Sequence, residues 1–214
     1  MTDVRERILQ ATVDAAAIHG VSRLSVADVA RRAGLSRPTL YKHFPSRDAL
    51  VAAAVQREAA AMVAAVHTVV VGIDEPRDAL EAGVLLALRL VRAHPLLDRV
   101  VRTEPEVLVT LLTTDDQLVM AAIRAPVQQM IATKFPGLDV VAERRLADML
   151  SRLLVSYALS APDDPPEVVA ALVAALLVDG AASLPAATPS AAVTPPAAVI
   201  RRAAAPPPAA EEAP

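Results

Sequence analysis

Side chains that could contact a polyanion are concentrated between Arg37 and His43. This segment offers a guanidinium, a hydroxyl, a phenol, an ammonium and an imidazole group, carried by Arg37, Thr39, Tyr41, Lys42 and His43. Arginine and lysine pair with guanine O6/N7 or with phosphate, and threonine can offer its methyl group to thymine or its hydroxyl group to a base or phosphate. The chemistry that this set predicts is hydrogen bonding to a nucleic acid.

A short helix is predicted to present these side chains. Ser36 is a good N-cap, and Pro38 falls in the first turn, where its missing N–H is harmless. Leu40 and Phe44, four residues apart, lie on one helical face and can anchor the helix to a core. The opposite face is left for the polar side chains.

A second short helix is predicted just before the first. Ser25 is its expected N-cap, and the tight turn after it is permitted by Gly34. The apolar residues have the spacing i, i+3, i+4, i+7 and are Val26, Val29, Ala30 and Ala33. Two short helices joined by a glycine-containing turn form a helix-turn-helix, here from Ser25 to Phe44. In this motif the first helix crosses the phosphate backbone and the second enters the major groove.

The charge distribution also favours an anionic partner near the N-terminus. Residues 1–50 carry a net charge of +3, and the remaining residues carry −6. Between residues 25 and 47, five basic residues stand against the single acid Asp28. Local positive charge gives phosphate affinity and makes it salt-dependent. A difference of a few charges can also arise by chance, so the charge alone is weak support.

Residues 24–50, LSVADVARRAGLSRPTLYKHFPSRDAL, resemble the DNA-binding domain of the tetracycline-repressor (TetR) family of transcriptional regulators. The preceding RERILQATVDAAAIHG resembles the first helix of that domain. The resemblance covers about residues 5–55, and its most specific part is the combination of Ala30, Gly34-Leu35-Ser36, Thr39-Leu40-Tyr41 and Phe44. In that family this domain is joined to a larger all-helical ligand-binding and dimerisation domain.

The resemblance implies roles for individual residues. Tyr41 and Arg47 would bind the DNA backbone, and Ser25 would cap its helix or touch a phosphate. The residues that would face bases or adjacent phosphates are Arg37, Pro38, Thr39, Lys42 and His43, with Ser36 at the start of the same helix. Val26 and Ala27 stand where some members have polar or basic residues, so base reading by the first helix is not implied. Alternatively, Tyr41 is a half-buried aromatic and the charged residues are simply solvated.

The whole chain is predicted to be all-α, because turn signals divide it into helical lengths without strand-like alternation. The expected helices cover about 3–19, 25–33, 36–44, 46–70, 76–93, 96–103, 105–113, 115–135, 139–161 and 166–182. Pro126 predicts a kink or break in the eighth of these. Residues 1–50 would form the three-helix DNA-binding domain, 51–182 the ligand-binding and dimerisation bundle, and 183–214 a disordered Ala/Pro-rich tail holding 8 of the 18 prolines.

Two further sites are expected in the bundle. The resemblance places an effector pocket among its helices, and the candidate lining residues are Leu86, Leu90, His94, Leu112, Met120 and Ile123. An apolar small molecule would fit them, although the same residues would also describe a solid core. The last two helices are apolar on more than one side and would pair with a second copy through Leu146, Leu150, Leu153, Tyr157, Leu172 and Leu176. A two-fold dimer reads two half-sites and so gains specificity.

Several classes of protein are disfavoured. The chain has no cysteine, which excludes disulfides and thiolate chemistry. His67 and His94 lack partners at metal-ligand spacing, and no catalytic constellation stands out, so we expect no metal, no cofactor and no enzyme activity. The charged start lacks the pattern of a signal peptide, and the longest apolar run, Val168 to Val178, is short for a membrane span. A soluble cytoplasmic protein is expected.

Together these observations predict a homodimeric transcriptional regulator. The specific expectation is a repressor that binds a palindromic double-stranded DNA operator and is released by a small apolar effector. The alternatives are a helical ligand-binding or protein-interaction module that does not bind DNA, and a small helical enzyme. The first alternative predicts loss of the basic residues around the motif, which are present, and the second predicts a charge-bearing pocket.

Overall fold

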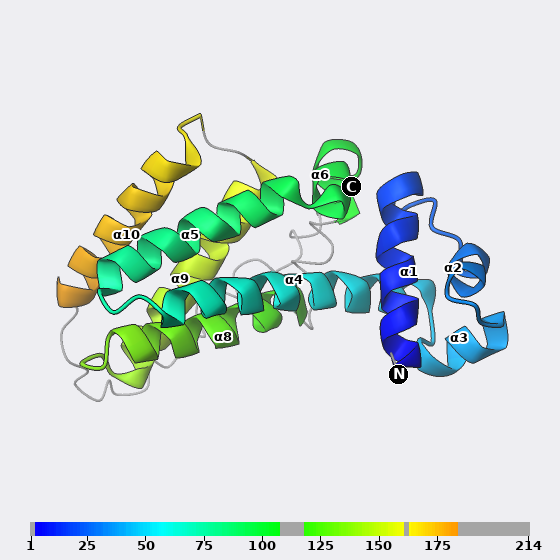
Figure 1. Ribbon diagram of the computed structural model, residues 1–214, viewed down its shortest axis with the longest axis horizontal. Coiled ribbons are helices and arrows are strands. Elements are labelled where there is room, and N and C mark those ends of the chain that lie inside the picture. The colour runs from blue at the N-terminus through cyan, green and yellow to red at the C-terminus, as the bar shows by residue number, and fades with distance from the viewer. Residues whose placement is uncertain (1–2, 108–117, 161–162, 184–214) are drawn as a thin grey trace, which may run out of the picture. The chain divides into compact units, whose positions relative to one another are not determined.

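The computed structural model describes residues 3–107, 118–160 and 163–183, and all regular structure within these ranges is helical, as expected (Figure 1). The helices are α1 (Val4–His19), α2 (Val26–Arg32), α3 (Arg37–His43), α4 (Arg47–Val71), α5 (Pro76–Ala93), α6 (Pro95–Thr103), α8 (Leu118–Lys134), α9 (Val140–Leu159) and α10 (Pro166–Ser183). They belong to one compact unit that ends at Leu184. Most of the helix expected at 105–113, and the expected tail, lie outside the described residues.

Local signals explain where most of these helices begin and end. The side chains of Asp3, Ser36, Ser46 and Asp139 accept hydrogen bonds from backbone N–H groups in the first turns of α1, α3, α4 and α9. At the other end of α1, Gly20 has φ +86°, a conformation that L side chains rarely adopt. Among the short N-terminal helices the Ser36 cap fixes α3, which has seven residues and is too short to be stable alone.

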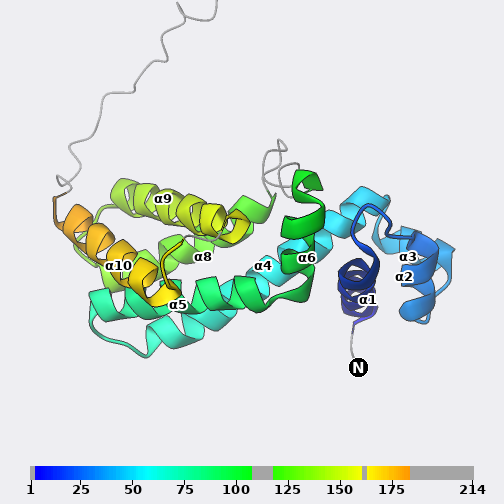
Figure 2. The same ribbon diagram turned by 90° about the horizontal axis from the view of Figure 1, so that it is seen from above.

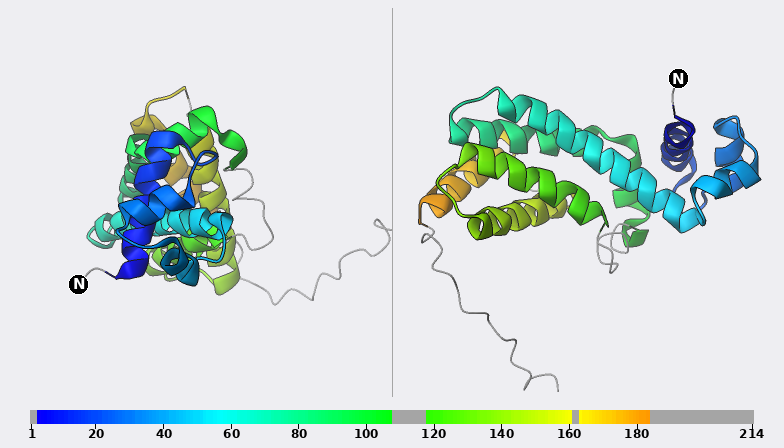
Figure 3. Two further views of the ribbon diagram at one scale, coloured as in Figure 1. Left: turned by 90° about the vertical axis from the view of Figure 1, so that its right-hand side faces the viewer. Right: turned by 90° about the horizontal axis from the view of Figure 1, so that it is seen from below.

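Helix α4 runs from the N-terminal helices into the rest of the compact unit. It packs against α1 near its start and against α5 and α8 along its remaining length (Figures 2 and 3). Helix α5 packs mainly against α10, and α8 packs against α9. The expected domain boundary at residue 50 therefore falls inside one continuous helix, and the boundary stays a proposal.

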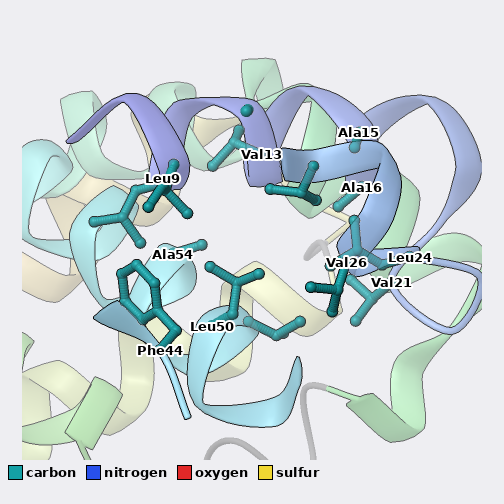
Figure 4. Close-up of a cluster of buried hydrophobic side chains, with 14 of the residues drawn as sticks. Leu9, Val13, Ala15, Ala16, Val21, Leu24, Val26, Phe44, Leu50 and Ala54 are labelled. Atoms are coloured by element: carbon teal, nitrogen blue, oxygen red, sulfur yellow. The ribbon is translucent and has the colours of Figure 1, made fainter. Parts of the chain in front are cut away.

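The N-terminal core joins α1–α4 to α6. Ile8, Leu9, Leu40 and Leu50 have at most 1% of their surface exposed, and Phe44 packs beside them (Figure 4). Ala15 and Ala16 of α1 are both buried in this core. From α6, Leu96 and Val100 complete the same core.

A second core lies between α5, α8, α9 and α10 and includes Val84, Val127, Leu150 and Val173. The sequence predicted a kink or a break at Pro126; helix α8 continues through this residue, so the break is wrong. A helix can continue past an internal proline when the neighbouring helices support it, because the proline ring removes only a local backbone hydrogen bond.

Helices α4 and α10 are long and apolar enough to cross a membrane by length and composition alone. In this structure α4 packs against α1, α5 and α8, and α10 packs mainly against α5, which buries 22% and 33% of their respective apolar windows. Core helices of globular proteins pass the same test, so this feature gives only weak support to a membrane role.

Candidate nucleic-acid interface and internal cavity

Helix α3 is held in place by its ends and its buried face. The Ser36 Oγ accepts the Thr39 N–H at 3.3 Å, and the two side-chain hydroxyl groups lie 2.8 Å apart. Leu40 and Phe44 are buried, as predicted, and the Arg5 guanidinium carbon lies 5.2 Å from the centre of the Phe44 ring. This contact is within the range of a cation–π interaction.

The opposite face of α3 is solvated. Arg37, Lys42 and His43 are exposed, and their side chains form no hydrogen bond or ion pair within the described part of the chain. Tyr41 is 43% exposed and Pro38 is exposed, whereas Thr39 is half-buried and engaged with Ser36. The sequence-predicted contact residues on α3 therefore lie on one accessible surface, with the hydroxyl of Thr39 already engaged.

Helix α2 differs from the prediction at its N-terminus. Ser25 occupies the N-cap position, but its side chain makes no capping hydrogen bond, so the prediction that it caps the helix is wrong. Its backbone is extended and the residue is exposed, which leaves the hydroxyl group free for solvent or a phosphate. Val26 is buried and cannot read bases, in line with the resemblance.

The basic residues at the end of α2 are already paired. Arg31 forms an ion pair with Asp28, and Arg32 bonds the other carboxylate oxygen at 2.8 Å. The hydrogen bond from Arg31, followed by that from Arg32, lowers the pKa of Asp28 below its ordinary value. The carboxylate therefore stays charged and reduces the local positive potential of this helix.

Arg47 has a structural position. Its guanidinium donates hydrogen bonds to the backbone carbonyl oxygens of Leu24, at 3.2 Å, and Val21, and it also contacts Asp48 at 3.2 Å. These contacts tie the loop between α1 and α2 to the first turn of α4. The resemblance implied a contact between Arg47 and the DNA backbone; three of its five N–H donors are used within the chain, and one N–H on each terminal nitrogen remains for a phosphate.

A cavity of ≈ 170 Å³ lies between α4, α5, α6, α8 and α9. Its wall is almost wholly apolar, and the α5 side is formed by small and medium residues that include Ala79, Gly83, Val84 and Ala87. Glu58 and Lys134 are the ionisable residues in the described wall. An internal space of this size is large enough for a small organic molecule.

Of the pocket residues predicted from the sequence, Ile123 lines the cavity. Leu86, Leu90, His94 and Met120 do not line this cavity, and Leu112 lies outside the described residues. The reason is physical. An internal space remains where side chains are too small to fill it, as along the Ala79–Val91 face of α5, and the bulky leucines fall on other faces of the helix.

His94 acts at the edge of the cavity instead. Its Nε2 lies 2.9 Å from Glu58 Oε2, and its Nδ1 accepts the Leu97 N–H at 3.3 Å as the N-cap of α6. An accepting Nδ1 requires that Nε2 carry the proton and donate it to Glu58. The other Glu58 oxygen lies 2.6 Å from Arg57, which also pairs with Glu6 of α1 at 2.6 Å. Polar contacts thus connect α1, α4 and α6.

Helix α6 touches both the cavity and the N-terminal core. Leu97 and Val101 line the cavity, whereas Leu96 and Val100 are buried in the N-terminal core. The two residues of each pair are four positions apart and therefore share a face of the helix. One face of α6 lines the cavity, and the neighbouring face packs into the N-terminal core.

Past the end of α6, Glu104 Oε2 accepts hydrogen bonds from the Ser22 N–H at 2.6 Å and the Ser22 hydroxyl group at 2.8 Å. A Cβ at Gly20 would meet Glu104 Oε1 at 1.9 Å, so this approach requires a glycine. Sequence reasoning missed this contact because 82 residues separate its partners.

The predicted dimer residues fall into three groups: buried, half-buried and exposed. Leu146 and Leu150 are buried in the core of the chain itself, and Leu150 lines the cavity, so their assignment to a dimer interface is wrong. Leu153 and Tyr157 are half-buried and pack against the same core. Leu172 and Leu176 of α10 are 55% and 64% exposed. Other exposed apolar residues are Val168 on α10 and Val140 and Met149 on α9.

The capped pair of short helices, with an exposed polar face on the second, defines a helix-turn-helix DNA-binding protein. The family described as bacterial regulatory proteins of the tetR family matches residues 8–54, and the bacterial tetracyclin repressor C-terminal domain matches residues 75–179. The chain therefore belongs to the TetR family of transcriptional regulators, as the resemblance implied, and this is not a family of enzymes.

Individual relatives agree with this assignment. An uncharacterised HTH-type transcriptional regulator of Mycobacterium bovis is 30% identical over 162 residues, which are 74% of this chain and 82% of that protein. The TetR family repressor AlkX of a Dietzia strain, implicated in biodegradation of n-alkanes, superposes with a TM-score of 0.71 at 22% identity, over 83% of this chain and 95% of that one. The fatty acid degradation regulator FadR of Bacillus halodurans gives 0.55 at 17% identity, with the same coverage. The two structural likenesses show the fold alone.

Proposed function

We propose that this regulator is a repressor that acts in the cytoplasm as a homodimer on a palindromic operator and leaves it when a small apolar molecule fills the cavity. The observation that carries the proposal is the position of α6, which lines the cavity with Leu97 and Val101 and the N-terminal core with Leu96 and Val100. A ligand that binds one arrangement of α6 better shifts the population toward that arrangement.

The proposed DNA contacts come from α3 and the exposed start of α2. Arg37, Lys42 and Tyr41 are accessible and reach outward, and His43 and Ser25 extend the same surface. Arg47 supports this surface by fixing the loop before α2, and its two remaining N–H donors can bind the phosphate backbone. One short helix reads only a few base pairs, so two copies are needed for a specific operator.

The proposed dimer uses the exposed apolar face of α9 and α10. Met149, Val168, Leu172 and Leu176 are each more than half exposed, which is unusual for large apolar side chains on a folded chain. A second copy would bury these side chains and add its own recognition helix. In a two-fold dimer, the same face of each subunit packs against its copy on the other subunit.

Replacing Lys42 by alanine should weaken operator binding without changing the fold, because Lys42 is exposed and pairs with no described residue. Each phosphate contact contributes a little under one to the slope of log affinity against log salt, so the slope should fall by about one per subunit. Tyr41→Ala should weaken binding as well. Fluorescence anisotropy on DNA flanking the gene, in a salt series, measures both effects.

The matched control is Arg77→Ala, which removes an exposed positive charge from α5, a helix outside the proposed DNA and dimer surfaces. It should leave the salt slope unchanged. If Lys42→Ala and Tyr41→Ala bind the operator with unchanged affinity and slope, the contact assignment is wrong. If no protected, roughly palindromic site is found for the wild-type protein, the chain is better described as a helical module that does not bind DNA.

The contact between Glu104 and Ser22 should contribute measurably to the attachment of α6 to the N-terminal helices. Glu104→Ala and Ser22→Ala should each lower the free energy of unfolding, and their effects should not add, with a coupling of about 1 kcal/mol because the shared hydrogen bonds are charge-assisted but exposed. Urea unfolding of the two single variants and the double variant tests this. Strictly additive effects would show that the hydroxyl bond carries no energy, because the Ser22 N–H can still donate to Glu104 in the Ser22→Ala variant.

A further inference from the structure

The wall of the cavity extends along α4 and α8. It includes α4 residues from Val55 to Val70 and α8 residues from Val119 to Phe135. At 1.5 Å of rise per residue, each of these stretches covers roughly 22 to 24 Å. A volume of ≈ 170 Å³ drawn out along helices of that length is a channel for a single extended chain rather than a chamber for a ring system.

The wall offers almost nothing but aliphatic carbon. Its described residues carry no hydroxyl, amide or imidazole side chain, and Phe135, at the far end, is the aromatic among them. A polar or hydroxylated molecule would lose hydrogen bonds to water here without replacement, whereas an alkyl chain gains from burial of every methylene. The middle of the ligand is therefore selected to be a saturated hydrocarbon.

The two charged residues of the wall are not equivalent. Glu58 uses one carboxylate oxygen for Arg57 and the other for His94, so its charge is balanced within the chain. Lys134, at the C-terminal end of α8, donates only to the neutral backbone oxygen of Ile73. Among the described residues, no carboxylate forms an ion pair with Lys134. A partly buried ammonium gains from an anion, so this end of the channel favours a negatively charged head group.

We propose that the effector is an unbranched aliphatic carboxylate that lies along α4 with its carboxylate beside Lys134 and its tail directed to Leu97 and Val101 of α6. This inference rests on the proposed function of the cavity as the effector site. It adds a consequence for regulation: a short chain fills the Lys134 end without reaching α6, and only a longer chain contacts the helix that joins the N-terminal core.

The test uses octanoate, dodecanoate and hexadecanoate, kept below their micelle concentrations, with dodecanol as the neutral probe and benzoate as the aromatic carboxylate. Isothermal titration calorimetry on the full-length protein without DNA should show affinity rising about fourfold for each added methylene until the chain outgrows the channel. Benzoate should bind far more weakly than dodecanoate. Affinity independent of chain length, or benzoate binding as tightly as dodecanoate, would overturn the proposal.

A substitution of Lys134 tests whether the ligand carboxylate lies beside this residue. Lys134→Met should lower the affinity for dodecanoate about tenfold, the effect of one charge-assisted hydrogen bond, and leave dodecanol unchanged. Arg144→Met, which removes an exposed charge outside the cavity, should change neither affinity. An equal loss for dodecanoate and dodecanol would show that Lys134 only supports the wall, and the assignment of the carboxylate would be wrong.

The position of the tail is tested by Ala87→Leu, which adds volume to the α5 side of the channel. The variant should lose affinity for hexadecanoate much more than for octanoate, and a loss equal for both chains would contradict the lengthwise placement. Operator release is measured separately by anisotropy. Tight dodecanoate binding with an intact operator complex would support the ligand class and overturn the proposed release. Release by another compound, with no carboxylate bound, would overturn the ligand class alone.

Discussion

Leu172→Glu should produce a folded monomer that has lost specific operator binding. Leu172 is 55% exposed on α10, so the substitution removes little core packing and should change the stability of the isolated chain by less than about 0.5 kcal/mol. In a dimer built on this face, each subunit would bury a carboxylate against apolar side chains, which costs several kcal/mol. Light scattering after gel filtration should report a single chain.

The effect on DNA follows from the loss of the second half-site. Two linked recognition helices bind with an avidity that exceeds that of one by a factor on the order of a hundred or more, so affinity for the operator should fall by at least this factor. Ile18→Glu is the matched control for oligomeric state, because Ile18 is also 55% exposed but lies on α1. A Leu172→Glu protein that remains dimeric would place the interface elsewhere.

Leu40→Ala should be the most destabilising single truncation in the N-terminal helices. The Leu40 side chain has no exposed surface and is surrounded by the core of α1, α2 and α4, so its loss should lower the free energy of unfolding by about 2 to 5 kcal/mol. That is a large fraction of the stability of a typical domain. Because α3 has seven residues, it has little other means of attachment and should detach first.

Urea unfolding followed by circular dichroism measures this loss, and hydrogen exchange shows whether it begins in α3. Tyr41→Ala is the neighbouring control, because its exposed ring should contribute within about 0.5 kcal/mol to stability while affecting DNA binding. A Leu40→Ala protein less than about 1 kcal/mol below the wild type would mean that the core refills the space, and that α3 is held by its caps.

The parts of the structure that could be predicted from the sequence are those with local causes. Gly34, Ser36, Leu40 and Phe44 lie within ten positions of one another, and each acts on its immediate neighbours, so the helix-turn-helix can be predicted from local sequence. Similar turn and capping signals elsewhere in the sequence predicted the all-α fold. Ser25 is the exception, since a suitable residue at the cap position makes no capping bond.

The parts that could not be predicted depend on packing between distant segments. Large apolar residues such as Leu86, Leu90 and Leu146 attract attention in a sequence, whereas the cavity is bordered on α5 by small ones, which leave space instead of filling it. The contacts of Glu58 with His94 and of Glu104 with Ser22 join residues 36 and 82 positions apart. No pattern within either segment indicates its partner.

Helix α4 also determines how a small change in the cavity would be amplified. Its first turns are embedded in the N-terminal core through Leu50 and Ala54, and Arg47 fixes the adjacent loop to them, while Val55 to Val70 border the cavity. With 25 residues it is about 37 Å long, so a tilt of about five degrees moves one end by roughly 3 Å relative to the other. Two copies tilting symmetrically would change the distance between their recognition helices by about the rise of two base pairs, enough to put them out of phase with the DNA helix.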